Sequence, residues 1–440
     1  MLKDFYCFFR KLEIENKGKI PMKKIKHIGF ISTRFCGIDG VSLETAKWAK
    51  ILEEEGHICF YMAGELDRPP ERSLVVKEAH FKHPEIKKIY EECFNNKRIR
   101  KPSTTGRIQK IKDKLKKDIY EFIKKFDIDV LIPENVLSLP LNIPLGIAIT
   151  EVIAETGIPT IAHHHDFCWE RKRLLVNAVW DYINMAFPPH LPSVQHVVIN
   201  SSADNQLSLR TGISATIIPN VMDFDNPPSI DDYSSDIREN LGLSSDEFLI
   251  LQPTRVVKRK GIEHSIELVK RLDMKAKLVI SHASGDEGYE YEQRIKEYSS
   301  LMGVDTLFIS DIIKPYRGRT EDGRKIYTPW DIYPHADLVT YPSNFEGFGN
   351  AFLEAIYFKK PVVVNNYSIY AIDIKPKGFK VIELDDYVNS EAIELTRKVL
   401  TNPELAREMT EHNYELGRKY YSCSILRKKL NVLLSNCFGV

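Results

Sequence analysis

Short apolar runs that alternate with helical patterns constrain the fold of this chain more than any other feature. Helical patterns such as residues 41–56 and 144–156 separate the runs. In the first half of the chain the runs are residues 27–32, 57–62, 129–133, 159–166 and 196–201. Runs of four to eight residues rich in Ile and Val are typical of strands in a parallel sheet that is buried on both faces. The first half is therefore predicted to be a doubly wound α/β domain.

The same alternation restarts after a stretch rich in Pro, Asp and Ser (217–235), which we interpret as a linker. The later runs are residues 248–254, 277–281, 306–310, 337–343 and 361–366. A chain of 440 residues fits two domains, because one domain usually has roughly 100–200 residues. We expect an N-terminal extension (1–21), a first Rossmann-like domain (22–219) and a second one (220–405).

Composition narrows the class of protein and its compartment. The net charge of +1 gives no overall field that would attract nucleic acid. Seven cysteines without a C-x-x-C pair argue against a disulfide framework and a structural zinc site. No run approaches the roughly 18 apolar residues of a membrane span, and the N-terminus is charged where a signal peptide is apolar. We expect a cytoplasmic protein without a nucleic-acid partner.

The segment 95–126 is crowded with Lys and Arg. Its rear half is predicted to be an amphipathic basic helix, because apolar residues recur there at helical spacing. The structural interpretation is a solvated helix face. The functional alternative is contact with an anionic acceptor or with the inner face of a membrane. The recurring apolar residues are Ile108, Ile111, Leu115, Ile119, Phe122 and Ile123.

Two strand-to-helix loops have the composition of phosphate sites. Gly37 and Gly40 lie in the first, where close backbone approach and helix N-terminal amides favour an anion, although a plain tight turn explains them equally well. In the second, Arg255 and Lys260 follow a strand and suit the two phosphates of a nucleotide. We interpret the neighbouring cations at 258–259 as surface residues that aid solubility. The alternative for Arg255 and Lys260 is that they, too, are surface cations of this kind.

Three consecutive histidines, His163 to His165, end the strand-like run 159–166. Strand alternation puts His163 and His165 on one face and His164 on the other, so the triplet is a poor zinc cluster by itself. A histidine at the carboxyl end of a strand can hydrogen-bond a substrate hydroxyl. Packed or capping histidines are the structural alternative.

The stretch EGFGNAFLEA (346–355) places Glu346 in a glycine-punctuated loop and Glu354 one turn inside a helix that begins near Asn350. The two carboxylates therefore cannot act as one pair. Glu346 is predicted to face the reacting group in a cleft, and Glu354 to reach hydroxyls nearby. Gly347 and Gly349 leave main-chain amides open at the helix N-terminus, which suits a diphosphate.

These features, in this order, resemble the retaining glycosyltransferases of the GT-B fold, glycosyltransferase family 4. The resemblance spans roughly residues 25 to 400 and rests on the glycine loop, on His165-Asp166, on R-x4-K-G (255–261) and on E-x7-E (346–354). The family usually has adjacent glycines in the first loop, whereas two residues separate Gly37 and Gly40 here. The fold implied is GT-B, with two Rossmann-like domains facing across a cleft and C-terminal helices (406–440) that cross back to the first domain.

The resemblance also implies residue roles, with the nucleotide sugar in the second domain and the acceptor in the first. Among the catalytic residues, Glu346 would contact the reacting end of the donor sugar and His165, or its alternate His164, would face that sugar. The cations Arg255 and Lys260 would hold the diphosphate, and no metal would be required. Donor binding would add Gly37, Gly40, Gly347, Phe348, Gly349, Asn350 and, at the ribose, Glu354.

The implied reaction moves a hexose from a UDP-, GDP- or ADP-hexose to a hydroxyl acceptor, with retention of anomeric configuration. Arg171 and Arg173 favour an anionic acceptor. A glycoside hydrolase and a non-enzymatic two-domain sugar-binding protein are the alternatives. The hydrolase would need two carboxylates across the bond but no phosphate-binding cations. No prediction of the oligomeric state follows.

Overall fold

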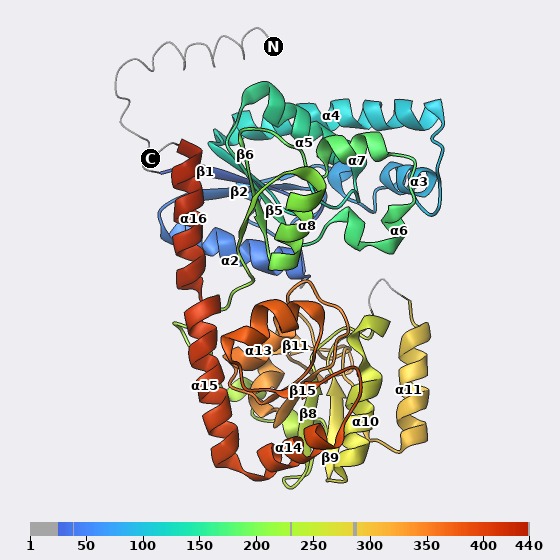
Figure 1. Cartoon of the computed structure of the whole chain (residues 1–440), viewed down its shortest axis with the longest axis vertical. Helices are drawn as coiled ribbons and strands as arrows, with labels where there is room; N and C mark the ends of the chain where they lie inside the picture. The colour runs from blue at the N-terminus through green and yellow to red at the C-terminus, as the bar shows by residue number, and fades with distance from the viewer. Residues whose placement is uncertain (1–24, 38, 229–230, 285–287, 439–440) are drawn as a thin grey trace.

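The computed structural model describes residues 25–37, 39–228, 231–284 and 288–438, so the expected N-terminal extension lies outside the described residues. The chain forms two α/β domains stacked along the long axis, and its C-terminal helices run along both (Figure 1). None of the described helices combines the length and the apolarity that a membrane span needs.

All strands of the first sheet pair in parallel. Its order is β3 (Ser73–Val75), β2 (Ile58–Ala63), β1 (His27–Ile31), β4 (Val130–Pro133), β5 (Thr160–His164), β6 (Val194–Val198) and β7 (Ala215–Ile217). The helices are α2 (Gly40–Glu54), α3 (Pro84–Cys93), α4 (Pro102–Phe126), α5 (Ile143–Thr156), α6 (Lys172–Leu175), α7 (Trp180–Ala186) and α8 (Ser201–Thr211). The five predicted strands are confirmed.

The second sheet is also parallel. Its order is β10 (Thr306–Phe308), β9 (Ala276–Ile280), β8 (Phe248–Gln252), β13 (Leu338–Tyr341), β14 (Val362–Asn365) and β15 (Ile382–Leu384). A small antiparallel ribbon joins β11 (Gly318–Arg319) to β12 (Lys325–Ile326). The helices are α9 (Ile237–Asn240), α10 (Ile262–Leu272), α11 (Glu290–Met302), α12 (Pro329–Ile332), α13 (Asn350–Tyr357), α14 (Ser390–Thr401), α15 (Pro403–Tyr421) and α16 (Cys423–Phe438). The prediction of two doubly wound domains is confirmed.

Helices cover both faces of the first sheet. One core joins the sheet to α4 and α5 through residues such as Phe122 and Ile149. The other joins it to α2 and α16 through residues such as Trp48 and Leu430, so the end of the chain packs on the first domain. Gly29 on β1 is required by this packing, because a Cβ there would lie 2.8 Å from the Phe122 ring.

The basic segment forms the long helix α4, and its predicted apolar stripe faces the sheet. Ile111 is partly buried, whereas the other five residues of the stripe are buried. Two lysines on the same side of α4 as the stripe pair with α5: the buried Lys112 with Glu151, and Lys116 with Glu151 and Glu155. These lysines tie α4 to its neighbouring helix.

Candidate active site

The loop after β13 presents a buried glutamate that two cations hold. Lys260 donates to Glu346 Oε1, and Arg259 Nη1 lies 2.8 Å from Glu346 Oε2. Burial would raise the pKa of Glu346, but Lys260 and then Arg259 lower it below its ordinary value. The interpretation of Arg259 as a solubilising surface cation is wrong, because its guanidinium reaches across to the neighbouring loop and pairs with this carboxylate.

The cations converge on the carboxyl end of β8. Lys260 is buried and Arg255 is exposed on the same loop. Burial lowers the pKa of Lys260, Glu346 raises it, and the nearby Arg259 and Arg255 lower it again. The same loop touches the Glu346 loop, because a Cβ on Gly261 would lie 2.4 Å from the Pro342 carbonyl oxygen. Positive charge is therefore concentrated beside Glu346.

Helix α13 begins at Asn350, as predicted, and no side chain caps its N-terminus. Gly349 has a φ of +123°, and a Cβ there would lie 2.5 Å from the Tyr367 hydroxyl, so only glycine fits. Uncapped amides at a helix N-terminus attract anions such as phosphate. The amides predicted to bind a diphosphate thus lie immediately after Glu346.

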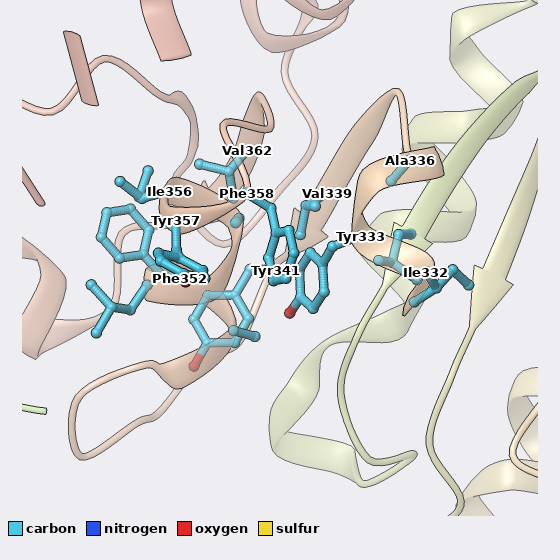
Figure 2. Packing of buried hydrophobic residues seen from close by; sticks show 14 of the residues in the cluster. Ile332, Tyr333, Ala336, Val339, Tyr341, Phe352, Ile356, Tyr357, Phe358 and Val362 are labelled. Carbon is cyan, nitrogen blue, oxygen red and sulfur yellow. The ribbon is translucent and has the colours of Figure 1, made fainter. Parts of the chain in front are cut away.

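Glu354 lies within α13 and has a hydrogen-bond partner of its own. Its Oε2 accepts a hydrogen bond of 2.6 Å from the Tyr333 hydroxyl. The Tyr333 ring stacks on Phe358 at 5.0 Å in the core of the second domain (Figure 2). Burial raises the pKa of Glu354, and the hydrogen bond from Tyr333 acts in the opposite direction. The two glutamates therefore occupy different environments, in keeping with the predicted separation of their roles.

The glycine loop of the first domain lies over the start of α13. A Cβ on Gly40 would lie 3.7 Å from the Asn350 side-chain nitrogen. Gly37 has a φ of +75°, and its amide donates to Asp67. The N-terminus of α2 is already occupied, because the Asp39 carboxylate accepts from the Ser42 amide at 3.1 Å. The Asp39 carboxylate thus satisfies one of the amides at this helix end, and donor binding by Gly37 and Gly40 stays a prediction.

The three histidines separate as strand alternation predicts. His163 Nδ1 and His165 Nε2 lie 2.9 and 3.3 Å from Glu134 Oε2. His164 points to the other face, where its Nε2 lies 2.9 Å from His196 Nδ1. The structure therefore leaves His165 partly exposed, with its carbonyl next to Gly347 of the second domain, whereas its alternate, His164, is buried inside the first domain.

Glu134 and Asn135 were missed by the sequence analysis. They follow β4 directly, in the sequence PEN, and the rule that strand ends carry functional groups could have found them. Glu134, His163 and His165 bring potential metal-ligand atoms within 4.8 Å of one another. Both imidazoles hydrogen-bond to one carboxylate oxygen, so the three residues form a hydrogen-bonded cluster in this structure.

The two arginines proposed for the acceptor lie at different places. Arg171 Nε donates to Asp166 Oδ2 at 2.6 Å, next to His165. Arg173 is exposed on α6 and lies near Tyr90, whose pKa it lowers against the effect of burial. Only Arg171 adjoins the His165–Asp166 turn.

The two domains meet around Glu346. The Gly347 carbonyl accepts from Asn200 Nδ2 at 2.6 Å, and a Cβ on Gly347 would lie 3.5 Å from the His165 carbonyl oxygen. A cavity of about 230 Å³ between α8 and the Glu346 loop is lined by residues of both domains, Glu346 included. A carboxylate, cations, helix-end amides and an imidazole thus converge from two domains. Such a set can bind a sugar and a diphosphate together and stabilise negative charge on a departing phosphate.

Comparison with known proteins gives the same picture. Residues 324–416 match the family model described as glycosyl transferases group 1. The chain is 33% identical to the mannosylglucosylglycerate synthase of Thermotoga maritima, over 90% of this chain and 96% of the relative. A glycosyltransferase from Rickettsia africae has a similar fold, with a TM-score of 0.65 at 16% identity over 94% and 99% of the two chains. Anabaena HepE, solved with UDP and glucose, has a TM-score of 0.60 at 14% identity over 93% and 100%.

Proposed function

The chain belongs to the glycosyl transferases group 1 and is a glycosyltransferase of the GT-B fold, and from this premise we propose the finer chemistry of its reaction. It transfers a hexose from a nucleotide-diphosphate sugar to an acceptor hydroxyl, with retention of anomeric configuration and without an obligatory metal ion. The observation that carries the proposal is the cluster of Lys260, Arg259 and Glu346 beside the uncapped N-terminus of α13.

The residues support a reaction in which the phosphate leaves toward fixed positive charge. The bond between the anomeric carbon and the phosphate oxygen breaks, and the acceptor oxygen bonds to that carbon from the same face. The acceptor proton passes to the departing phosphate oxygen. Lys260, Arg255 and the α13 amides stabilise the diphosphate, because preorganised donors act most strongly where charge develops. Glu346 binds hydroxyls of the sugar and need not form a covalent bond.

The acceptor is proposed to be a sugar that bears a carboxylate. The Thermotoga maritima relative is named for a product that contains mannose, glucose and glycerate. A mannosyl transfer to glucosylglycerate would fit that product, and Arg171 beside His165 is the nearest candidate for binding the carboxylate. The complex of HepE with UDP and glucose supports a nucleotide donor for this fold.

The experiment is a panel of UDP-, GDP- and ADP-hexoses with glucosylglycerate as acceptor, and with glucosylglycerol as its neutral control. We expect one donor to release nucleotide diphosphate, faster with the acid than with the neutral control. Equal release without any acceptor would favour hydrolysis. Binding of a sugar without release from any donor would favour a binding protein.

A further inference from the structure

We propose that Glu134 is a positioning residue for His165, and that its carboxylate holds the imidazole in place on the first-domain wall of the cleft. The inference rests on the proposed function, because it concerns how the same site is kept in shape. It is carried by the geometry at the carboxyl ends of β4 and β5.

A single carboxylate oxygen holds both imidazoles. Glu134 is fully buried, and its Oε2 lies 2.9 Å from His163 Nδ1 and 3.3 Å from His165 Nε2. With Nε2 directed at Glu134, Nδ1 is the ring nitrogen that His165 can offer to a sugar hydroxyl. The carboxylate therefore selects both the orientation of the ring and the nitrogen that it presents, as an orienting carboxylate does for other reactive histidines.

Two stacked rings, Trp48 and His163, pack behind the Glu134–His165 pair. Trp48 of α2 stacks on His163 at 4.2 Å with an interplanar angle of 20°. His163 then lies 4.3 Å from His165, ring centre to ring centre. Trp48 and His163 are each 1% exposed, so both rings are enclosed by the protein. Rigid packing behind a functional group keeps that group close to its productive geometry.

The residue next to Glu134 holds the main chain of the same turn. Asn135 Oδ1 accepts from the amide of His165 at 3.0 Å, and Asn135 Nδ2 donates to Asp166 at 3.0 Å. Asn135 itself has a φ of +60°, in the left-handed region that few residues other than glycine adopt. At the end of β4, Glu134 thus holds the ring of His165 and Asn135 holds its main chain.

Charged groups from three directions act on the His165 ring. Burial lowers its pKa, but Glu134, Glu44 of α2 and the adjacent Asp166 raise it above the ordinary value. His163 is the only other titratable ring packed on it among the described residues, and burial lowers the pKa of His163. The favoured pair is therefore a Glu134 carboxylate with a readily protonated His165 beside a neutral His163.

The test is a double-mutant cycle of Glu134→Gln and His165→Gln with steady-state kinetics. Glu134→Gln should lower kcat on the order of 10²-fold by misplacing the ring. It should change the donor KM by no more than about twofold, because it removes no ground-state contact with the nucleotide. In the His165→Gln background, Glu134→Gln should have no further effect. Two effects that multiply would overturn the proposal.

A second readout needs no substrate and therefore separates this proposal from the proposed function. NMR titration of the His165 ring, assigned by its absence in His165→Gln, should give a pKa above that of ordinary histidine. In Glu134→Gln the pKa should be lower than in the wild type. An unchanged pKa in a folded Glu134→Gln variant would overturn the proposal. If Glu134→Gln fails to fold, the same titration of the His165 ring is made in Glu134→Asp and in the wild type. A wild-type His165 pKa below that of ordinary histidine would contradict the proposal.

Discussion

The two walls of the cleft are built on the same plan with different basic groups. In the second domain a buried glutamate, Glu346, is held by Lys260 and Arg259. In the first domain a buried glutamate, Glu134, is held by His163 and His165. Both glutamates follow the end of a parallel strand, where ligands of such sheets bind. The second wall therefore has strongly basic partners, whereas the partners in the first wall are imidazoles, a group whose ordinary pKa lies near neutral pH.

This difference separates binding of a charged donor from positioning of its sugar. Burial opposes ionisation of both glutamates, and in both cases the basic partners win and lower the pKa. A guanidinium and an ammonium suit a diphosphate, whose charge grows as the bond breaks. An imidazole suits a hydroxyl. Substitutions in the second wall should therefore lower turnover most. The effects of substitutions in the first wall should depend on pH.

The largest effect is expected from Lys260→Gln. Turnover should fall roughly 10²–10³-fold, about 3–4 kcal/mol, because one fixed donor to the departing phosphate is lost. Donor affinity should fall less, since the charge on the phosphate is greatest in the transition state. Lys258→Gln, an exposed position in the same loop, is the matched control and should behave like the wild type. Steady-state kinetics and calorimetry of nucleotide-diphosphate binding measure both quantities, and equal losses in the two variants would contradict the assignment.

Substitution of each of the two glutamates should separate sugar transfer from donor binding. Glu346→Gln should lower turnover on the order of 10²-fold, without weakening nucleotide-diphosphate binding, because Lys260 and Arg259 lose a competing carboxylate. Glu354→Gln should mainly raise the donor KM about tenfold, as expected when a charge-assisted hydrogen bond is lost in the ground state. The same kinetics and calorimetry check both. Wild-type behaviour of Glu346→Gln, with turnover lost in Glu354→Gln, would reverse the proposed roles.

A pH dependence of stability should mark the first wall. The raised pKa of His165 stabilises the folded protein below the ordinary imidazole pKa, and this contribution is lost as the pH rises through the folded pKa. The melting temperature of His165→Gln should therefore lie further below that of the wild type at about pH 6 than at about pH 8.5.

The second wall supplies the contrast for that measurement. The lowered pKa of Glu346 contributes stability that disappears only as the pH falls through that value, below the ordinary carboxyl pKa of about 4.3. The difference between Glu346→Gln and the wild type should thus stay constant between the two pH values. A His165→Gln difference that is also constant would show that the two walls do not differ in this way.

The smallest effect is expected from substitution of lysines on α4, which lie outside both walls of the cleft. Lys112→Glu and Lys116→Glu should destabilise the first domain by roughly 1–3 kcal/mol, because each places a second negative charge against Glu151 of α5. The donor KM should not change. Lys117→Glu, at an exposed position of the same helix, is the control. Thermal melting and donor kinetics check this, and a raised donor KM at preserved stability would assign α4 to the cleft.

The sequence predicts the sheets well and their edges poorly. Ten of the strands follow from short runs rich in Ile and Val, which are typical of a sheet buried on both faces. Three edge strands, β3, β7 and β15, were missed; each has only three residues, as does β10, the one edge strand of the two large sheets that was predicted. At an edge, pairing with a neighbour decides the structure, and local propensity does not report it.

The candidate site was predictable where one segment carries the signal. Glu346 and the start of α13 follow from glycines and helix periodicity within ten residues. The pairing of Arg259 with Glu346 spans 87 positions, and that of Glu134 with His165 spans 31. Such contacts depend on which strands lie side by side, which no local pattern contains. Arg259 was consequently assigned to the surface, and Glu134 was not considered.

The most direct test follows the transfer reaction by proton NMR in the presence of EDTA, with the donor selected from the hexose panel. The proposal predicts release of nucleotide diphosphate at the rate seen without chelator, because cationic side chains and helix-end amides replace a divalent ion. It also predicts that the new anomeric proton has the configuration of the donor. Loss of the reaction in EDTA with recovery in Mg²⁺, or a product of inverted configuration, would contradict the account.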